Sequence, residues 1–235
     1  MISTSLSSAP GPAPAAGTVR NINLFGPAGR LEALLNEAAP AAPFAALVCH
    51  PHPLGKGTLH NKVVYHAMKV LNAPEWGFAL PVLRFNFRGT GLSEGTHDGK
   101  AEVGDVLAAI DWLQNEFKRP VIVAGFSFGA AMALLACCGL TPPSSLIKAL
   151  VALGLPISAE GHIYRYSFLS GCRLPKLFLS GDRDQYAPGA ELKHVADAAA
   201  DPKKLVLISG ADHFFTGQLE AMQQALAAWL KEQLS

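Results

Sequence analysis

Hydrophobic residues in this chain fall into two patterns, short continuous runs and stripes at helical spacing. The continuous apolar runs, which are typical of strands buried on both faces, lie at 44–49, 77–87, 121–126, 146–153, 174–179 and 205–208. Helical spacing appears between them, at 59–71, 102–117, after residue 127, at 189–199 and at 218–234. Buried strands that alternate with helices predict an α/β fold with a mostly parallel central sheet and helices on both faces.

The N-terminal part departs from this alternation. Val19 to Phe25 alternates apolar with polar residues, as an outer strand does, and Gly26 to Gly29 forms a turn signal. Arg30 to Glu37 is then an antiparallel partner strand, although its periodicity also fits a short helix. Residues 1–17 are mostly Ser, Ala, Pro and Gly without the features of a secretory signal, so we expect a disordered tail and a single domain over 18–235.

Composition excludes several classes of function. The chain has 235 residues and a formal net charge of +1, with no run of Lys or Arg. Nothing therefore indicates a nucleic acid or an anionic membrane as partner. No apolar stretch reaches the ~20 residues that span a bilayer. We expect a small-molecule substrate, and the sequence is compatible with a homodimer.

The cysteine pattern indicates reduced thiols. Cys137 and Cys138 are adjacent in a predicted helix, Cys49 ends a predicted strand, and Cys172 lies in a loop. This spacing fits neither a disulfide framework nor a zinc site. We therefore expect buried, reduced thiols and a cytoplasmic protein.

The candidate chemistry centres on Gly125-Phe-Ser127-Phe-Gly129, between an apolar strand and a helix rich in Ala and Leu. A serine at such a sharp turn adopts a strained backbone conformation and exposes its hydroxyl, and glycines flank it because neighbouring chains come close. The N-terminus of the following helix points at the same place and would stabilise negative charge there.

The chain from 44 to the C-terminus resembles the alpha/beta-hydrolase superfamily. The motifs that carry the resemblance are HPHPLGKGTLHNKVV, NFRGTGLSEG, GFSFG, SGDRDQYAP and GADHFF, in that order. The HPHP loop followed by NKVV is similar to small bacterial serine hydrolases without a cap domain, many of them carboxylesterase-like. Two consecutive glycines are typical of that loop, and here Lys56 separates Gly55 from Gly57.

The superfamily places nucleophile, acid and histidine in that chain order. The resemblance assigns these roles to Ser127, Asp184 and His213. Asp182 is the alternative acid in the same loop. Asp212 is excluded because the side chains of adjacent residues point apart.

The oxyanion hole needs two backbone N–H groups. Phe128, the residue after the nucleophile, supplies one. Pro51 and Pro53 have no N–H, which leaves His52 and Leu54, and the superfamily's His-Gly-x-Pro pattern aligns His52 with the second donor. His50 and His52 could instead bind a metal, but no third ligand is nearby, so we predict no metal and no cofactor. Arg88 is expected to buttress its glycine-rich turn, with substrate contact as the alternative role.

The resemblance implies hydrolysis of small carboxylic esters through an acyl-enzyme. A thioesterase, lactonase, acyltransferase or peptidase with the same triad, or a non-catalytic binding member of the fold, are the alternatives. Residues 155–173 are too few for a helical lid and carry Tyr164, Tyr166 and other apolar residues that either line the pocket or pack on the sheet. The open site favours short acyl chains.

Overall fold

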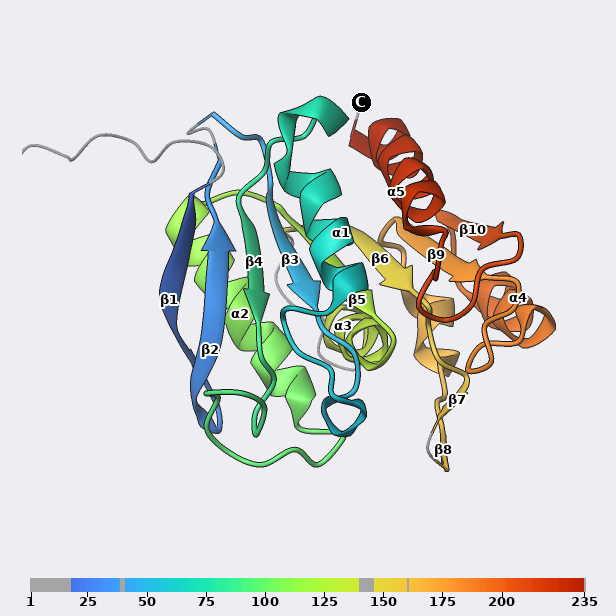
Figure 1. Ribbon diagram of the computed structural model, residues 1–235, viewed down its shortest axis with the longest axis horizontal. Coiled ribbons are helices and arrows are strands. Elements are labelled where there is room, and N and C mark those ends of the chain that lie inside the picture. Colours follow the sequence, from blue (N-terminus) through green and yellow to red (C-terminus); the bar gives the residue numbers. More distant parts are fainter. Residues whose placement is uncertain (1–17, 39–40, 140–145, 160, 235) are drawn as a thin grey trace, which may run out of the picture.

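The computed structural model describes residues 18–38, 41–139, 146–159 and 161–234. Within them one sheet has the strand order β1-β2-β4-β3-β5-β6-β9-β10 (Figure 1). Its strands are β1 (Val19–Gly26), β2 (Gly29–Asn36), β3 (Ala45–Cys49), β4 (Val82–Phe85), β5 (Val121–Phe126), β6 (Ile147–Leu153), β9 (Lys176–Gly181) and β10 (Lys203–Ile208). The pairs β1–β2 and β2–β4 are antiparallel and all other pairs are parallel. The predicted N-terminal hairpin and mostly parallel sheet are confirmed.

Helices cover both faces of the sheet, as the alternation of strands and helices requires. On one face lie α2 (Glu102–Phe117), α3 (Phe128–Cys138) and α4 (Gly189–Ala198), and on the other lie α1 (Lys62–Asn72) and α5 (Leu219–Leu234) (Figure 1). The side chains of β3 alternate between the two cores: Leu47 packs on the first and Val48 on the second. None of the helices described here is long and apolar enough to cross a membrane.

The observed β4 is shorter than the predicted strand at 77–87. Gly77 and Ala79 both have positive φ, at 90° and 47°, and Pro81 has no N–H to donate to a ladder. The apolar run continues from Phe78 to Pro81 because these residues are buried or partly buried, not because they pair with a neighbouring strand, whereas Gly77 is exposed. The predicted disordered tail, residues 1–17, lies outside the described residues.

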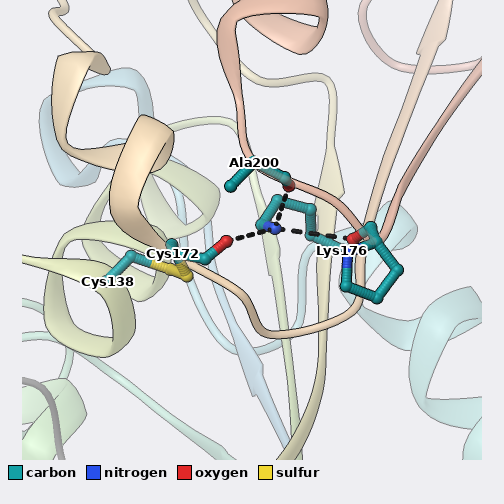
Figure 2. Close-up of a disulfide and its surroundings, with 5 residues drawn as sticks. Cys138, Cys172, Lys176 and Ala200 are labelled. Atoms are coloured by element: carbon teal, nitrogen blue, oxygen red, sulfur yellow. Dashed lines mark hydrogen bonds between the residues drawn. A yellow bond between two sulfur atoms is a disulfide. The ribbon is translucent and has the colours of Figure 1, made fainter.

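The prediction that all four cysteines are reduced is wrong. Cys138, at the end of α3, forms a disulfide with Cys172, just after the 3₁₀ helix η3 (Ser167–Gly171) (Figure 2). Only Cys49 and Cys137 are free, and both are buried. The sequence showed no such pair because nothing in it indicates that the fold brings together two cysteines with a sequence separation of 34. The disulfide also removes the thiol argument for a cytoplasmic location.

Lys176 lies beside this disulfide and is almost fully buried, with 1% of its surface exposed (Figure 2). Its Nζ donates to the backbone carbonyls of Cys172 at 2.7 Å, Ala200 at 2.8 Å and Pro202 at 3.4 Å. Burial lowers the pKa of its ammonium from 10.5 to about 8. The lysine therefore joins the start of β9 to two neighbouring loops, at the opposite end of that strand from Asp184.

Candidate active site

Ser127 lies at the abrupt turn between β5 and α3, with φ of 55° and ψ of −122°. A Cβ on Gly125 would come within 2.4 Å of the carbonyl oxygen of Gly129, and one on Gly129 would come within 2.4 Å of that of His50. No side chain fits at either position, which explains both glycines of the motif. The predicted strained serine turn is confirmed.

Three predicted side chains meet at the carboxyl ends of the parallel strands. His213 Nε2 lies 2.9 Å from Ser127 Oγ, and His213 Nδ1 lies 2.8 Å from Asp184 Oδ2. A neutral imidazole protonated on Nδ1 donates to the carboxylate and accepts from the serine hydroxyl. The imidazole and the carboxylate are both shielded from solvent, with side-chain exposures of 3% and 0%.

Asp184 is held by further donors that the other two candidate acids lack. Ser180 Oγ donates to its Oδ2 at 2.9 Å, and the Tyr186 N–H donates to its Oδ1 at 2.9 Å. Asp182 instead accepts from the N–H of Gly210 at 2.7 Å, the structural bond expected of it. Asp212 accepts from the N–H groups of Thr216 and Phe214, and the first of these bonds contributes most to lowering its pKa. Only Asp184 of the three forms a hydrogen bond with the histidine.

Aromatic rings surround the imidazole of His213. Its centroid lies 4.9 Å from that of Phe126, 4.6 Å from that of Tyr186 and 5.2 Å from that of Phe214. Tyr186 and Phe214 make edge contacts and Phe126 a tilted one, and packing at these distances is favourable and limits rotation of the imidazole. The histidine is therefore oriented by its carboxylate and by the packing around it.

The two predicted oxyanion donors flank the serine. Phe128 is the first residue of α3, so its N–H is one of the four that a helix leaves without an intrahelical acceptor. His52 follows β3, the strand next to β5. The carbonyl of His52 accepts from the N–H groups of Gly55 at 3.1 Å and Gly57 at 3.0 Å, which closes the loop into a tight turn.

His50 holds this loop in place, a role that the sequence did not reveal. Its Nδ1 lies 2.6 Å from the Pro51 carbonyl oxygen, and its Nε2 accepts from the Phe87 N–H at 3.0 Å. The same peptide group carries the Pro51 carbonyl and the His52 N–H on opposite sides, because the peptide bond is planar and trans. A bond to one group therefore fixes the direction of the other. The ring is fully buried, and burial lowers its pKa from 6.5 to about 4.

The geometry at Gly57 and Lys56 shows how this loop accommodates a lysine between its glycines. A Cβ at this position would lie 2.1 Å from the Pro51 carbonyl oxygen, so only glycine allows the loop to close over that peptide. Lys56 adopts the left-handed conformation at φ of 62° and exposes its side chain. The loop thus tolerates a lysine between its two glycines.

The comparisons with known proteins agree with this geometry. The model of the alpha/beta hydrolase domain family matches residues 65–232. The chain belongs to this family. An uncharacterised protein of Rickettsia prowazekii is 38% identical over 214 residues, which cover 87% of this chain and 86% of that protein.

Solved structures of other proteins are similar to this hydrolase over nearly its whole length. An alpha-beta serine hydrolase homologue from Coxiella burnetii is 31% identical with a TM-score of 0.77, covering 90% of this chain and 97% of its own. A serine hydrolase without a lid from Xanthomonas campestris is 27% identical with a TM-score of 0.76, covering 94% and 97%. The fold predicted from the sequence is therefore confirmed.

Arg88 of this hydrolase buttresses its turn, as expected. Its Nη2 lies 2.7 Å from Asp105 Oδ1 in α2, and its own backbone N–H donates to the same carboxylate at 3.0 Å. Asn86, two residues earlier, accepts from the Leu59 N–H at 2.8 Å and donates to Glu32 at 2.7 Å. Both residues fix the loops beside the serine from outside the site.

A cavity of about 100 Å³ opens over the serine. Ser127, His213, Tyr186, Phe214 and Tyr164 contribute to its walls. Tyr164 comes from the segment 155–173, which holds a short hairpin, β7 (Ser158–Ala159) and β8 (His162–Ile163), and no α-helix among its described residues. Tyr166 of the same segment is buried instead and donates to the Pro156 carbonyl. The segment therefore supplies both a pocket wall and core packing.

Proposed function

We propose that this hydrolase cleaves small carboxylic esters through an acyl-enzyme. One observation carries the proposal: Ser127, His213 and Asp184 form an unbroken chain of hydrogen bonds at 2.9 and 2.8 Å. A serine hydroxyl is weakly nucleophilic near neutral pH and needs an adjacent base. The arrangement supplies that base together with a buried carboxylate to orient it.

In the first step Ser127 Oγ attacks the ester carbonyl carbon while His213 Nε2 takes the hydroxyl proton. Asp184 stabilises the imidazolium that forms. The N–H groups of His52 and Phe128 donate to the developing oxyanion. The tetrahedral intermediate collapses when the C–O bond to the alcohol breaks and the imidazolium gives its proton to the departing oxygen.

Water completes the reaction. His213 removes a proton from a water molecule, which attacks the acyl-enzyme carbonyl. Collapse of the second intermediate releases the carboxylic acid and returns the proton to Ser127. These steps do not require a metal, since the imidazole accepts and returns each proton and the two N–H groups stabilise the oxyanion of each tetrahedral intermediate.

A fluorophosphonate probe followed by intact mass measurement tests the proposal. We expect a single adduct on the wild type and none on Ser127→Ala or His213→Ala. Ser170→Ala serves as a matched control, because it removes an exposed serine hydroxyl that makes no contact with the three residues, and it should still be labelled. A folded wild type that takes no label, or labelling that survives Ser127→Ala, would contradict the assignment. A panel of esters, thioesters and lactones then ranks the bond types by kcat/KM.

A further inference from the structure

A second cavity adjoins the site and contains neither Ser127 nor His213 in its lining. Its volume is about 330 Å³, and it shares with the first cavity His52, Phe128, Ala159 and Tyr164. The shared residues include both proposed oxyanion donors. The second cavity therefore borders both proposed oxyanion donors, while the catalytic serine and histidine line only the first cavity.

The proposed mechanism decides which half of an ester can reach this cavity. The alcohol oxygen must lie next to His213 Nε2, because that nitrogen gives it a proton as it leaves. The carbonyl oxygen points at the His52 and Phe128 N–H groups. The acyl group then extends past these two residues, which is the direction of the second cavity. This assignment rests on the proposed esterase function.

The walls of the second cavity consist largely of rings. They are His52, His97, Phe128, His162 and Tyr164. The centroids of His52 and His97 are 4.8 Å apart, those of His52 and Phe128 5.0 Å, and those of His97 and Phe128 5.4 Å. His162 and Tyr164 are in edge contact at 4.6 Å. A planar ring placed among them gains edge and face contacts that a saturated chain does not.

The size and charge of the cavity agree with a neutral ring. A cavity of about 150 Å³ accepts a benzene molecule, so the 330 Å³ available here also accommodates a short linker to the ester carbonyl. The charged residues of the lining are Lys100 and Asp98, one of each sign. The Asp98 carboxylate accepts from the N–H groups of Ala101 at 2.7 Å and Lys100 at 2.8 Å, which lowers its pKa. One charge of each sign in the lining favours neither an anionic nor a cationic acyl group.

We infer that this hydrolase prefers esters whose acyl group carries an aromatic ring, with the ring held in the second cavity. Isomeric esters provide the test. Methyl phenylacetate carries the ring on the acyl side and benzyl acetate carries it on the alcohol side, while the two have the same composition. Methyl cyclohexylacetate keeps the size of the acyl group without the aromatic ring. Each kcat/KM is divided by the rate constant of hydroxide-catalysed hydrolysis of the same ester, which corrects for intrinsic reactivity.

We expect the corrected kcat/KM of methyl phenylacetate to exceed that of the other two esters about three- to tenfold. His162→Leu and Tyr164→Leu should reduce both ratios towards one. Tyr65→Leu, which removes an exposed ring of α1 outside both cavities, should leave them unchanged.

The outcomes separate this inference from the proposed function. Absence of both probe labelling and hydrolysis of any ester means that the proposed function has failed. Labelling by the probe together with equal or inverted ratios overturns the aromatic preference and leaves the esterase mechanism intact. Ratios that survive both leucine variants also overturn it, because the preference would then arise outside the ring-lined cavity.

Discussion

His50 provides the sharpest test of how the loop after β3 supports the chemistry. The ring makes two different hydrogen bonds: its Nδ1 donates to the Pro51 carbonyl at 2.6 Å, and its Nε2 accepts from the Phe87 N–H at 3.0 Å. Only the first fixes the peptide that carries the His52 N–H. Substitution by Asn retains a donor near the position of Nδ1, whereas substitution by Gln retains an acceptor near that of Nε2.

The two variants should differ in catalysis but not in stability. Each loses one buried hydrogen bond and leaves one buried group without a partner, which costs about 1–3 kcal/mol of unfolding free energy. Loss of an oxyanion donor lowers kcat about 10²- to 10³-fold, and a misdirected His52 N–H approaches that loss. We therefore expect His50→Gln to lower kcat about 100-fold and His50→Asn to stay within about tenfold of the wild type.

Steady-state kinetics on one ester, combined with urea unfolding of each variant, measures both effects. KM should change little, because the oxyanion contact forms fully only in the transition state. If the Asn and Gln variants lose kcat equally while both remain folded, the bond to Pro51 does not orient the oxyanion donor. Wild-type kcat in His50→Gln would refute the reasoning outright.

Four further changes test other parts of the structure. Gly57→Ala should lower kcat without abolishing folding, because the added Cβ would lie 2.1 Å from the Pro51 carbonyl oxygen and displace that group; Gly171→Ala, whose added Cβ meets no atom within 4 Å and whose φ is not positive, is the matched glycine control in the same assay. The double variant Cys138→Ser, Cys172→Ser should lose about 4 kcal/mol of unfolding free energy in urea, the loop-closure value for a separation of 34 residues, and reductant should lower the stability of the wild type alone. The pKa of His50 in the folded state, about 4, lies below its unfolded value of 6.5, so its contribution to stability is complete above pH 6.5. The free energy of unfolding falls by about 3 kcal/mol as the pH drops towards 4, and an acid titration of His50→Asn should lack this pH-dependent loss. Lys176 also has a lowered pKa in the folded state, about 8, so between pH 8 and 10.5 the unfolded chain binds more protons than the folded one. The free energy of unfolding therefore rises with pH in this range, and unfolding curves of Lys176→Met should not show that rise.

The parts of this hydrolase that the sequence predicted well are those fixed by local backbone chemistry. Ser127 could be identified from the sequence because a serine flanked by two glycines, between a buried strand and a helix, is typical of the strained turn that exposes a nucleophile. His213 and Asp184 followed from chain order, and the structure places both within hydrogen-bond distance of their predicted neighbours. The prolines of the loop removed two backbone donors and left His52 and Leu54, and the resemblance to the superfamily pattern then favoured His52.

What the sequence missed depends on contacts between distant segments. The bond from His50 to the next peptide is local, but its second bond, to Phe87 on a neighbouring loop, exists only once β3 and β4 pair. The disulfide requires η3 to return to the end of α3, and no periodicity encodes that return. The ring-lined cavity has the same origin, since His52, His97 and Tyr164 come from three loops that converge only in the folded chain. The nucleophile and the base can thus be predicted from motifs, whereas the proposed substrate preference depends on contacts between loops. Variants that change these loops and leave the triad intact are therefore the ones that test it.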